Sequence, residues 1–218
     1  MNIFFDNVSF DSSSGPNSFG KKLRDELIKN DHTVSNVLSD WIQDDPDVQL
    51  SFIASQMKRA PLIQRLDGIY FNSEQDFKKL NTPIQATYDV SDAVIFESEF
   101  NKELTEHWFG KKENSYVIHN GTDLKAIAAI ESANIPVLDK FSETWCCASS
   151  WRPHKRLSEN IRYFLEHSDE NTCLVVAGEN PDLKITHERI FYAGSLDYLS
   201  LISLYTSSMA RSLSQCRY

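Results

Sequence analysis

Two cations, Arg152 and Lys155, stand three residues apart in the segment Trp151-Arg152-Pro153-His154-Lys155-Arg156-Leu157. An apolar run at 143–150, typical of a buried strand, precedes this segment, and a helical pattern at 156–167 follows it. The N-terminus of a helix carries unpaired backbone N–H groups and the positive end of the helix dipole. With a guanidinium and an ammonium at the same place, the pattern predicts a site for a phosphate or diphosphate. The alternative is a solvated basic patch at the start of a helix.

Composition limits the classes of protein to which the chain can belong. It has 218 residues, of which 41% are hydrophobic and 11% aromatic. That is enough apolar material for a sizeable core, in one large or two small domains. The formal net charge of −9 argues against a general nucleic-acid-binding protein, because a phosphate backbone would be repelled overall. Nucleic acid is therefore not an expected partner, and any phosphate site must be local.

The first residues and the cysteines favour a cytoplasmic protein. The start, Met1-Asn2-Ile3-Phe4-Phe5-Asp6, is too short and turns acidic too early for a signal peptide, and no stretch resembles a membrane span. The cysteines show neither metal-ligand nor redox spacing, and the first three lie in apolar, strand-like runs. We expect reduced thiols in the core. The four are Cys146, Cys147, Cys173 and Cys216.

Short apolar runs alternate with helical patterns, which is typical of an α/β protein with parallel sheets. Strands are expected at 2–6, 48–53, 60–65, 93–97, 116–119, 143–150, 172–177 and 189–193. Helices are expected from the loop at 12–17 to about residue 30, and at 82–91, 98–110, 124–130, 156–167 and 195–208. Because the pattern restarts after residues 120–140, we expect two Rossmann-like lobes, 1–125 and 140–218.

Several helices carry end signals. Thr82 followed by Pro83 is typical of an N-cap with proline at the first helical position. Ser98 is expected to cap the next helix and Gly110 to end it. Apolar residues that recur on one helical face are Phe19, Leu23 and Leu27, then Phe100, Leu104 and Trp108, then Leu157, Ile161, Phe164 and Leu165.

The turn at Asn120-Gly121-Thr122-Asp123 has two interpretations. Asn-Gly is usually a hairpin signal. The residues that follow, 124–130, have a helical pattern and not that of a returning strand. A tight turn where the chain leaves the first lobe for the second is therefore favoured.

Segments along the chain match the motifs of one enzyme family in the order in which that family has them. Residues 117–123, Val-Ile-His-Asn-Gly-Thr-Asp, are similar to a Val-Ile-Pro-Asn-Gly-Val-Asp turn, and Trp151 to Leu157 resembles a donor-phosphate motif. The other matches are the loop Gly15 to Phe19, the strand end Gln64 to Gly68, Ser98-Glu99-Phe100, the strand Leu174 to Glu179, the turn Tyr192 to Leu196, and Leu204 to Ser208. Together they cover roughly residues 2 to 208 and resemble the retaining GT-B glycosyltransferases of the family-4 type.

This resemblance implies a GT-B fold of two Rossmann-like lobes with parallel sheets. It also implies transfer of a sugar from a nucleotide-sugar donor to an acceptor with retention of configuration. The leaving group is a nucleoside diphosphate, so fixed cations at its β-phosphate stabilise the transition state more than the ground state. Arg152 and Lys155 are the candidates for that role. Enzymes of this fold generally use no metal, and none is expected here.

The resemblance assigns roles to five further residues. Gly15 and Asn17 would bring backbone amides to the same diphosphate from the first lobe, although an ordinary Gly-Pro turn is the alternative. Asp67 would orient an acceptor or donor hydroxyl, and the alternative is a carboxylate that caps a turn at a strand end. Ser195 and Leu196 lie in the turn that the family places beside the nucleobase.

The implied setting is polysaccharide or glycoconjugate synthesis. The expected partners are a nucleotide-sugar donor and a sugar, lipid-linked or glycan acceptor. The location would be cytoplasmic, with peripheral contact to the inner membrane face as an option. A nicotinamide-dependent oxidoreductase is disfavoured, since no Gly-x-Gly-x-x-Gly follows either first strand.

The C-terminus departs from the family. Residues 209–218 are polar, basic and aperiodic, where the family has another strand, a Glu-x7-Glu segment and further helices. We therefore expect an incomplete second lobe, poor packing of residues 210–218, and a homo-oligomer as one way to cover the unfinished sheet. An alternative function follows, a non-catalytic fragment that keeps the fold and at most binds nucleoside diphosphate.

Overall fold

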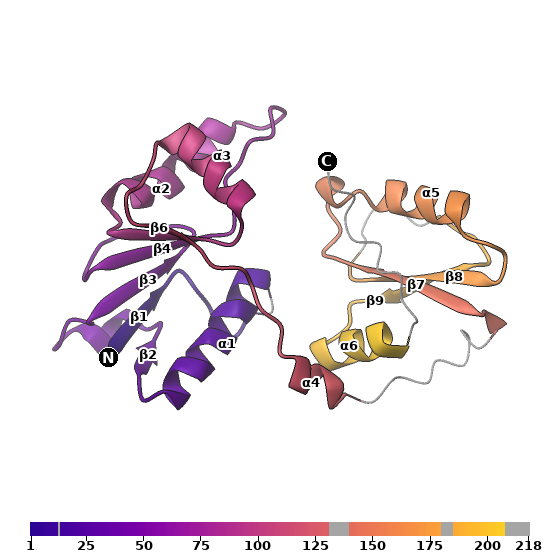
Figure 1. Cartoon of the computed structure of the whole chain (residues 1–218), viewed down its shortest axis with the longest axis horizontal. Helices are drawn as coiled ribbons and strands as arrows, with labels where there is room; N and C mark the ends of the chain where they lie inside the picture. The colour runs from indigo at the N-terminus through magenta and orange to yellow at the C-terminus, as the bar shows by residue number, and fades with distance from the viewer. Residues whose placement is uncertain (13, 131–139, 180–184, 208–218) are drawn as a thin grey trace. The chain divides into compact units, whose positions relative to one another are not determined.

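A computed structural model describes residues 1–12, 14–130, 140–179 and 185–207 of the chain. The chain divides into two compact units, Met1–Gly121 and Thr122–Tyr218, which are called unit 1 and unit 2 below. Each unit is built on a parallel sheet with helices on both faces (Figure 1). The predicted α/β class with parallel sheets is confirmed. The C-terminal tail discussed above lies outside the described residues.

Unit 1 has a six-stranded sheet in the order β2-β1-β3-β4-β5-β6, with every neighbouring pair parallel. Its strands are β1 (Asn2–Asp6), β2 (Thr33–Ser35), β3 (Val48–Phe52), β4 (Leu62–Leu66), β5 (Ala93–Phe96) and β6 (Ser115–Val117). Its helices are α1 (Gly15–Lys29), α2 (Phe77–Val90) and α3 (Glu99–Phe109), and Leu38–Trp41 forms a 3-10 turn. The short edge strand β2 was not among the expected elements, since three partly exposed residues give little hydrophobic pattern.

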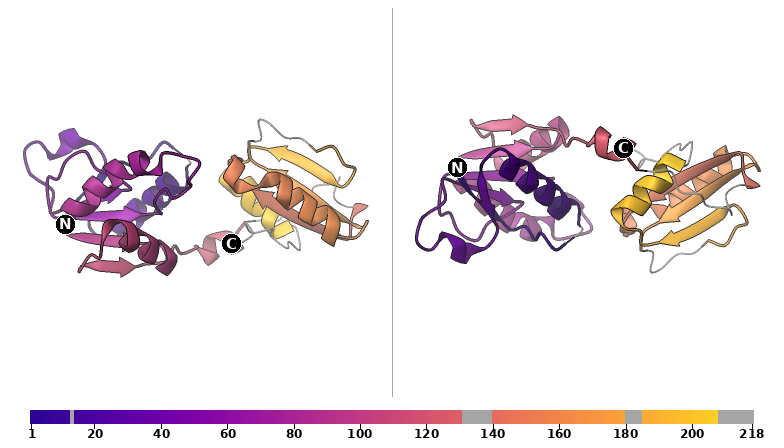
Figure 2. Two further views of the ribbon diagram at one scale, coloured as in Figure 1. Left: turned by 90° about the horizontal axis from the view of Figure 1, so that it is seen from above. Right: turned by 90° about the horizontal axis from the view of Figure 1, so that it is seen from below.

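Helices cover both faces of the unit 1 sheet. The face predicted for α1, with Phe19, Leu23 and Leu27, packs against buried Phe5 and Phe52. On the other face α2 and α3 pack against Leu66, Val94 and Phe96. The two views of Figure 2 bring first α2 and α3, and then α1, to the front.

Helix α2 begins at Phe77, and its N-cap lies six residues before the expected one. The side chain of Asp76 accepts a hydrogen bond from the backbone N–H of Lys79 (3.2 Å) and is the N-cap, so the prediction that Thr82 is the cap is wrong. Pro83 lies inside the helix and lacks one backbone donor there. The helix continues through it because its next turns are buried, with Ile84, Thr87 and Tyr88 at most 3% exposed.

Helix α3 has the predicted ends, and of the three residues predicted for its apolar face Leu104 packs against the core. Ser98 accepts a hydrogen bond from the N–H of Asn101 (3.2 Å), and Gly110, with φ of 92°, ends the helix, as expected. Phe100 and Trp108, however, are 61% and 47% exposed, whereas Asn101 and Thr105 are buried. The buried face is polar because Asn101 makes hydrogen bonds at the end of the sheet, described below.

Unit 2 has a three-stranded parallel sheet within its described residues, in the order β7-β8-β9. The strands are β7 (Glu143–Ala148), β8 (Thr172–Ala177) and β9 (Ile190–Gly194). The helices are α4 (Leu124–Ala128), α5 (Leu157–His167) and α6 (Tyr198–Ser207), and Pro153–Lys155 forms a 3-10 turn. α5 covers one face, through the predicted residues Leu157, Ile161 and Phe164, and α6 covers the other through Leu204 (Figure 2).

Three of the cysteines lie in the core of unit 2, as predicted. Cys146, Cys147 and Cys173 are free and buried. Burial raises the pKa of Cys147 to about 12, so its thiol stays protonated at neutral pH. The fourth, Cys216, lies outside the described residues.

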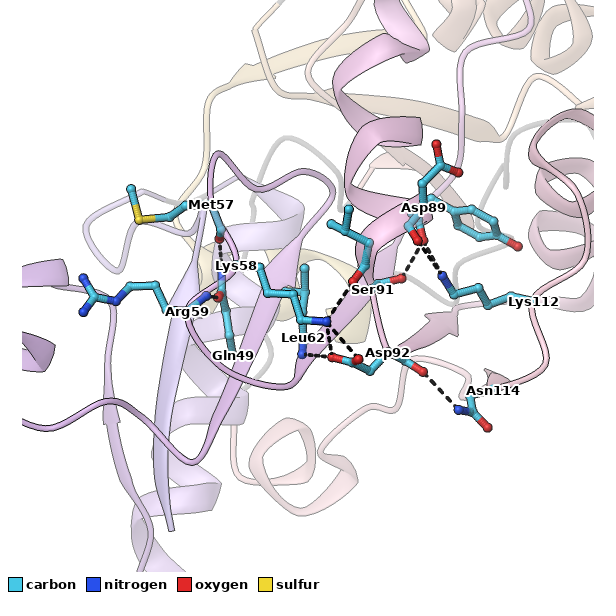
Figure 3. Close-up of polar contacts among 12 residues, drawn as sticks. Gln49, Met57, Lys58, Arg59, Leu62, Asp89, Ser91, Asp92, Lys112 and Asn114 are labelled. Carbon is cyan, nitrogen blue, oxygen red and sulfur yellow. Dashed lines mark hydrogen bonds and ion pairs between the residues drawn. The ribbon is translucent and has the colours of Figure 1, made fainter.

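A polar cluster at the amino ends of β4 and β5 fastens the sheet to α2 (Figure 3). The ammonium of Lys58 donates to the Asp92 carboxylate (2.8 Å) and to the carbonyl of Val90 (3.0 Å). The other Asp92 oxygen accepts the N–H of Leu62 (2.6 Å). The hydrogen bond from Lys58 is the main cause that lowers the pKa of Asp92.

Lys112 acts beside this cluster at the last turn of α2. Its ammonium donates to the carbonyls of Tyr88 (2.6 Å) and Asp89 (3.3 Å) (Figure 3). Cations are favourable at the C-terminus of a helix, where the dipole is negative and carbonyls lack partners. This end of the sheet is therefore occupied by structural contacts.

No helix among the described residues is long and apolar enough to cross a membrane.

Candidate functional site

The opposite end of the unit 1 sheet carries a cluster of polar side chains around Arg65. Parallel strands bring their carboxyl ends to one edge, where ligands of open α/β sheets usually bind. Arg65, in β4, is only 5% exposed. Its guanidinium donates through Nη1 to the carboxylate of Asp67 and through Nη2 to Oδ1 of Asn120 (2.9 Å). The ring of Phe19 from α1 lies against it, 3.9 Å from the guanidinium carbon.

Glu97, directly after β5, lies between two asparagine amides. Asn101 of α3 donates to one of its carboxylate oxygens (3.2 Å), and Asn120 donates to the other (3.1 Å). Arg65 Nη2 is 4.0 Å from the second oxygen. Burial is the main cause that raises the pKa of Glu97, the charge of Asp67 adds to it, and Arg65 and the two amides oppose it. The neighbours therefore only partly offset the cost that burial imposes on the charged form of this carboxyl group.

His119 joins this edge from the end of β6. Its Nδ1 is 2.9 Å from the backbone carbonyl of Glu97. Because a carbonyl can only accept, Nδ1 carries the hydrogen, and in the neutral ring Nε2 is then an acceptor. The side chain is exposed, so that acceptor can reach a solute.

Asp67 is the one residue of this cluster for which the sequence predicted a role. Its side chain is 26% exposed and is held by Arg65, while its backbone carbonyl accepts from Asn101 (3.0 Å). Gly68, with φ of 142°, follows it, and a Cβ there would stand 3.2 Å from the Asn101 amide oxygen. The other members have no role predicted from the sequence, although each lies within five residues of an expected strand end. They are Arg65, Glu97, Asn101, His119 and Asn120.

Gly15 and Asn17 lie in the first turn of α1, also in unit 1. The amide oxygen of Asn17 accepts the N–H of Ser9 (2.9 Å), so this side chain holds the loop that follows β1. Gly15 is exposed, and no heavy atom would contact a Cβ placed on it within 4 Å. The backbone of this turn is therefore open to a ligand.

In unit 2, Trp151 fixes the loop that carries the two predicted cations. Its indole N–H donates to the carbonyl of Ala177 (2.9 Å), and its backbone N–H donates to the carbonyl of Glu179 (3.2 Å). The indole is buried against Leu157 and Ile161 of α5. The loop after β7 is thus tied to the carboxyl end of β8.

Gly178 lets the same loop approach β8. Its φ is 101°, and a Cβ on it would stand 1.9 Å from the carbonyl oxygen of Ser149. Its N–H donates to the carbonyl of Gly194 at the end of β9 (2.6 Å). The three strand ends of unit 2 therefore meet at one glycine.

Arg152 and Lys155 lie just before α5 and not in its first turn. Arg152 is the N-cap of the 3-10 turn Pro153–Lys155, and Lys155 is its last residue. Arg156, in the left-handed region with φ of 54°, separates that turn from the helix. Arg152 is exposed and Lys155 half-buried. Within the described part of the chain, neither head group has a hydrogen-bond or ion-pair partner. Both charges are available to an anion.

The first turn of α5 itself already holds an acidic group. The carboxylate of Glu159 accepts a hydrogen bond from the hydroxyl of Ser158 (2.8 Å), which is the main cause that lowers its pKa. Arg156 Nε lies 3.5 Å from the same carboxylate. Attraction for an anion at this edge therefore depends on Arg152 and Lys155, more than on the helix N-terminus that the sequence suggested.

Ser195 and Leu196 follow β9 at the same edge of the sheet. Ser195 is exposed, whereas Leu196 packs partly buried against the cluster around Cys146 and Val175. Parallel pairing thus gathers four of the predicted residues at one sheet edge. They are Arg152, Lys155, Ser195 and Leu196. Among the described residues, no group of three or more His, Cys, Asp or Glu side chains is placed to hold a metal ion.

No protein-family model and no curated protein matches this chain. Among solved structures, Anabaena Alr3699/HepE in complex with UDP and glucose is similar, with a TM-score of 0.65 and 14% identity over 95% of this chain and 72% of that one. An alpha-glucosyltransferase in complex with UDP-glucose and DNA is also similar, with a TM-score of 0.53 and 13% identity over 81% of this chain and 57% of that one. UDP-N-acetylglucosamine 2-epimerase from Rickettsia bellii is similar as well, with a TM-score of 0.53 and 12% identity over 98% of this chain and 74% of that one. At these identities the likeness shows the fold, and the predicted GT-B fold is confirmed.

Replacing Gly178 by alanine is expected to lower the free energy of unfolding by more than about 2 kcal/mol, since the new Cβ meets a backbone carbonyl and the φ is unfavourable for alanine. Urea denaturation followed by circular dichroism and tryptophan fluorescence measures the change. Gly121→Ala is the control, because nothing lies within 4 Å of its Cβ. Equal stability of the two variants would contradict this account of the loop.

The raised pKa of Glu97 predicts a pH-dependent stability difference between the parent and Glu97→Gln. The pKa of a glutamate in the unfolded chain is about 4.3, and the pKa of Glu97 in the folded chain is higher. Protonation of Glu97 therefore stabilises the folded parent fully below about pH 4.3, and this stabilisation is lost as the pH rises through the folded pKa. The free energy of unfolding of the parent minus that of the variant should therefore fall as the pH rises from about 4.3 towards neutrality. Urea titrations across this range measure it, with Glu99→Gln on the exposed start of α3 as control. A difference that rises with pH would refute the assignment.

Proposed function

We propose that this chain is a glycosyltransferase that moves a sugar from a nucleotide-sugar donor to an acceptor. The observation that carries the proposal is the loop after β7, where Trp151 and Gly178 fix two cations without partners among the described residues, Arg152 and Lys155, at a sheet edge. Structures of similar fold were determined with UDP or UDP-glucose bound, which supports a nucleotide-sugar as the donor.

The chemistry follows from the charge on the leaving group. As the bond between the sugar and the β-phosphate breaks, negative charge grows on the phosphate oxygens. Arg152 and Lys155 would stabilise that charge, and they act without reorganisation because their loop is already tied to β8. The exposed turn at Ser195 would lie beside the nucleobase. No metal is proposed, and the sugar is proposed to keep its anomeric configuration.

Three residues of unit 1 have proposed roles as well. Backbone amides at Gly15 and Asn17 are proposed for the diphosphate, and Asp67 for a hydroxyl of the acceptor or the donor. The acceptor would be a sugar, a lipid-linked sugar or a glycan, in the synthesis of a polysaccharide or glycoconjugate in the cytoplasm. A protein that binds nucleoside diphosphate without transferring sugar is the alternative.

Arg152→Ala and Lys155→Ala are each expected to weaken binding of UDP by roughly 1–3 kcal/mol, the range for a hydrogen bond to a charged group. Isothermal titration calorimetry measures the affinity. Arg162→Ala, which removes an exposed cation from α5, is the matched control and should bind as the parent does. If the parent binds UDP and both variants bind it equally well, the two cations form only a solvated patch.

Transfer from UDP-α-glucose is expected to give a product with an α-glycosidic bond. Nuclear magnetic resonance of the product, through the coupling constant of its anomeric proton, measures the configuration. A β-linked product would refute retention and leave the nucleotide-sugar proposal intact. Binding of UDP with no transfer to any of a panel of sugar acceptors would favour the non-catalytic alternative.

A further inference from the structure

The Arg65 cluster has a different electrostatic character from the loop in unit 2. One guanidinium faces two carboxylates, Asp67 and Glu97, and the amides and the His119 ring around them. Such a cluster repels phosphate and suits neutral groups that donate hydrogen bonds, above all hydroxyls. The Arg65 cluster is therefore suited to a ligand that carries hydroxyl groups.

Within the cluster, accessibility separates two kinds of residue. The side chains of Asp67 and Glu97 are 26% and 31% exposed, and the side chain of Arg65 is 6% exposed. The hydrogen bond from Arg65 to Asp67 uses Oδ1 and leaves Oδ2 for a ligand. A ligand can therefore reach the carboxylates but not the guanidinium.

Arg65 also connects segments that are far apart in the sequence. It lies in β4 and stacks on Phe19 of α1. It also donates a hydrogen bond to Asn120, which lies 55 residues later in the sequence, next to the last residue of unit 1. Asn120 in turn donates to Glu97 (3.1 Å). Removal of the guanidinium leaves Asp67 and Asn120 without the group that fixes both.

We propose that Arg65 is a positioning residue, which holds Asp67, Asn120 and through it Glu97 as a binding site for the hydroxyl groups of a saccharide. This role rests on the proposed function for the identity of the ligand, but its geometry does not depend on the site in unit 2. Arg65 contacts no ligand itself and acts through the orientation of the two carboxylates.

The test compares Arg65→Met, Arg65→Lys and Asn120→Ala with the parent. Carbon-13 resonance of the glutamate carboxyls, with Glu97→Gln for assignment, follows the titration of Glu97. Because Arg65 opposes the rise of the Glu97 pKa, the titration should move to higher pH in Arg65→Met and less in Arg65→Lys. Asn120→Ala keeps the cation but removes one donor, and it should move the titration in the same direction.

The second measurement is binding of glucose, galactose, mannose and N-acetylglucosamine, followed by the side-chain amide resonances of Asn101 and Asn120. At least one sugar should shift these resonances in the parent and bind about tenfold more weakly to Arg65→Met. Lys112→Met is the matched control: it removes a cation from the opposite end of the same sheet, and it should change neither sugar binding nor the Glu97 titration.

Three results would overturn the proposal. The first is an unchanged Glu97 titration in Arg65→Met, and the second is a sugar affinity that this substitution leaves unchanged. The third is that none of the four sugars shifts the Asn101 or Asn120 amide resonances in the parent. If Arg65→Met does not fold, Arg65→Lys and Asn120→Ala decide by the same criteria. UDP binding should stay at the parent level in all three variants, so failure of the unit 2 site and failure of this one are distinguishable.

Discussion

Parallel pairing of the strands is the constraint on which both candidate sites depend. Every strand pair in the two sheets is parallel, so side chains that follow different strands meet at one edge although the sequence separates them. Arg65 and Asn120 are 55 residues apart, and Trp151 and Ala177 are 26 apart. The opposite edge of unit 1 holds Lys58 and Lys112 in contacts that only close the fold.

Much of the fold could be predicted because strands buried on both faces leave continuous apolar runs. β1, β8 and the buried face of α5 follow from such patterns alone. Local signals misled where tertiary packing outweighed them. Pro83 is typical of a helix start, yet α2 continues through it because the residues after it are buried. Phe100 and Trp108 of the predicted apolar face of α3 remain exposed, because the helix turns Asn101 and Thr105 to the buried side.

The candidate sites were predictable to different degrees. Arg152 and Lys155 could be found from the sequence because both charges lie in the one loop that directly follows a strand. Glu97, His119 and Asn120 could not, since each resembles an ordinary turn residue until β5 and β6 place them beside Arg65. Their place in the site depends on which strands pair with which, and a local sequence pattern does not show that pairing.

The cysteines have a practical consequence for following motion within the chain. All four belong to unit 2, and unit 1 has none. Cys146, Cys147 and Cys173 are at most 3% exposed, and a thiol with a pKa of about 12 hardly reacts at neutral pH. In the variant Cys216→Ser, alkylation of the remaining thiols would therefore occur only when unit 2 opens. The rate of alkylation then measures how often unit 2 opens. Unfolding of unit 1 contributes no signal, because unit 1 has no thiol.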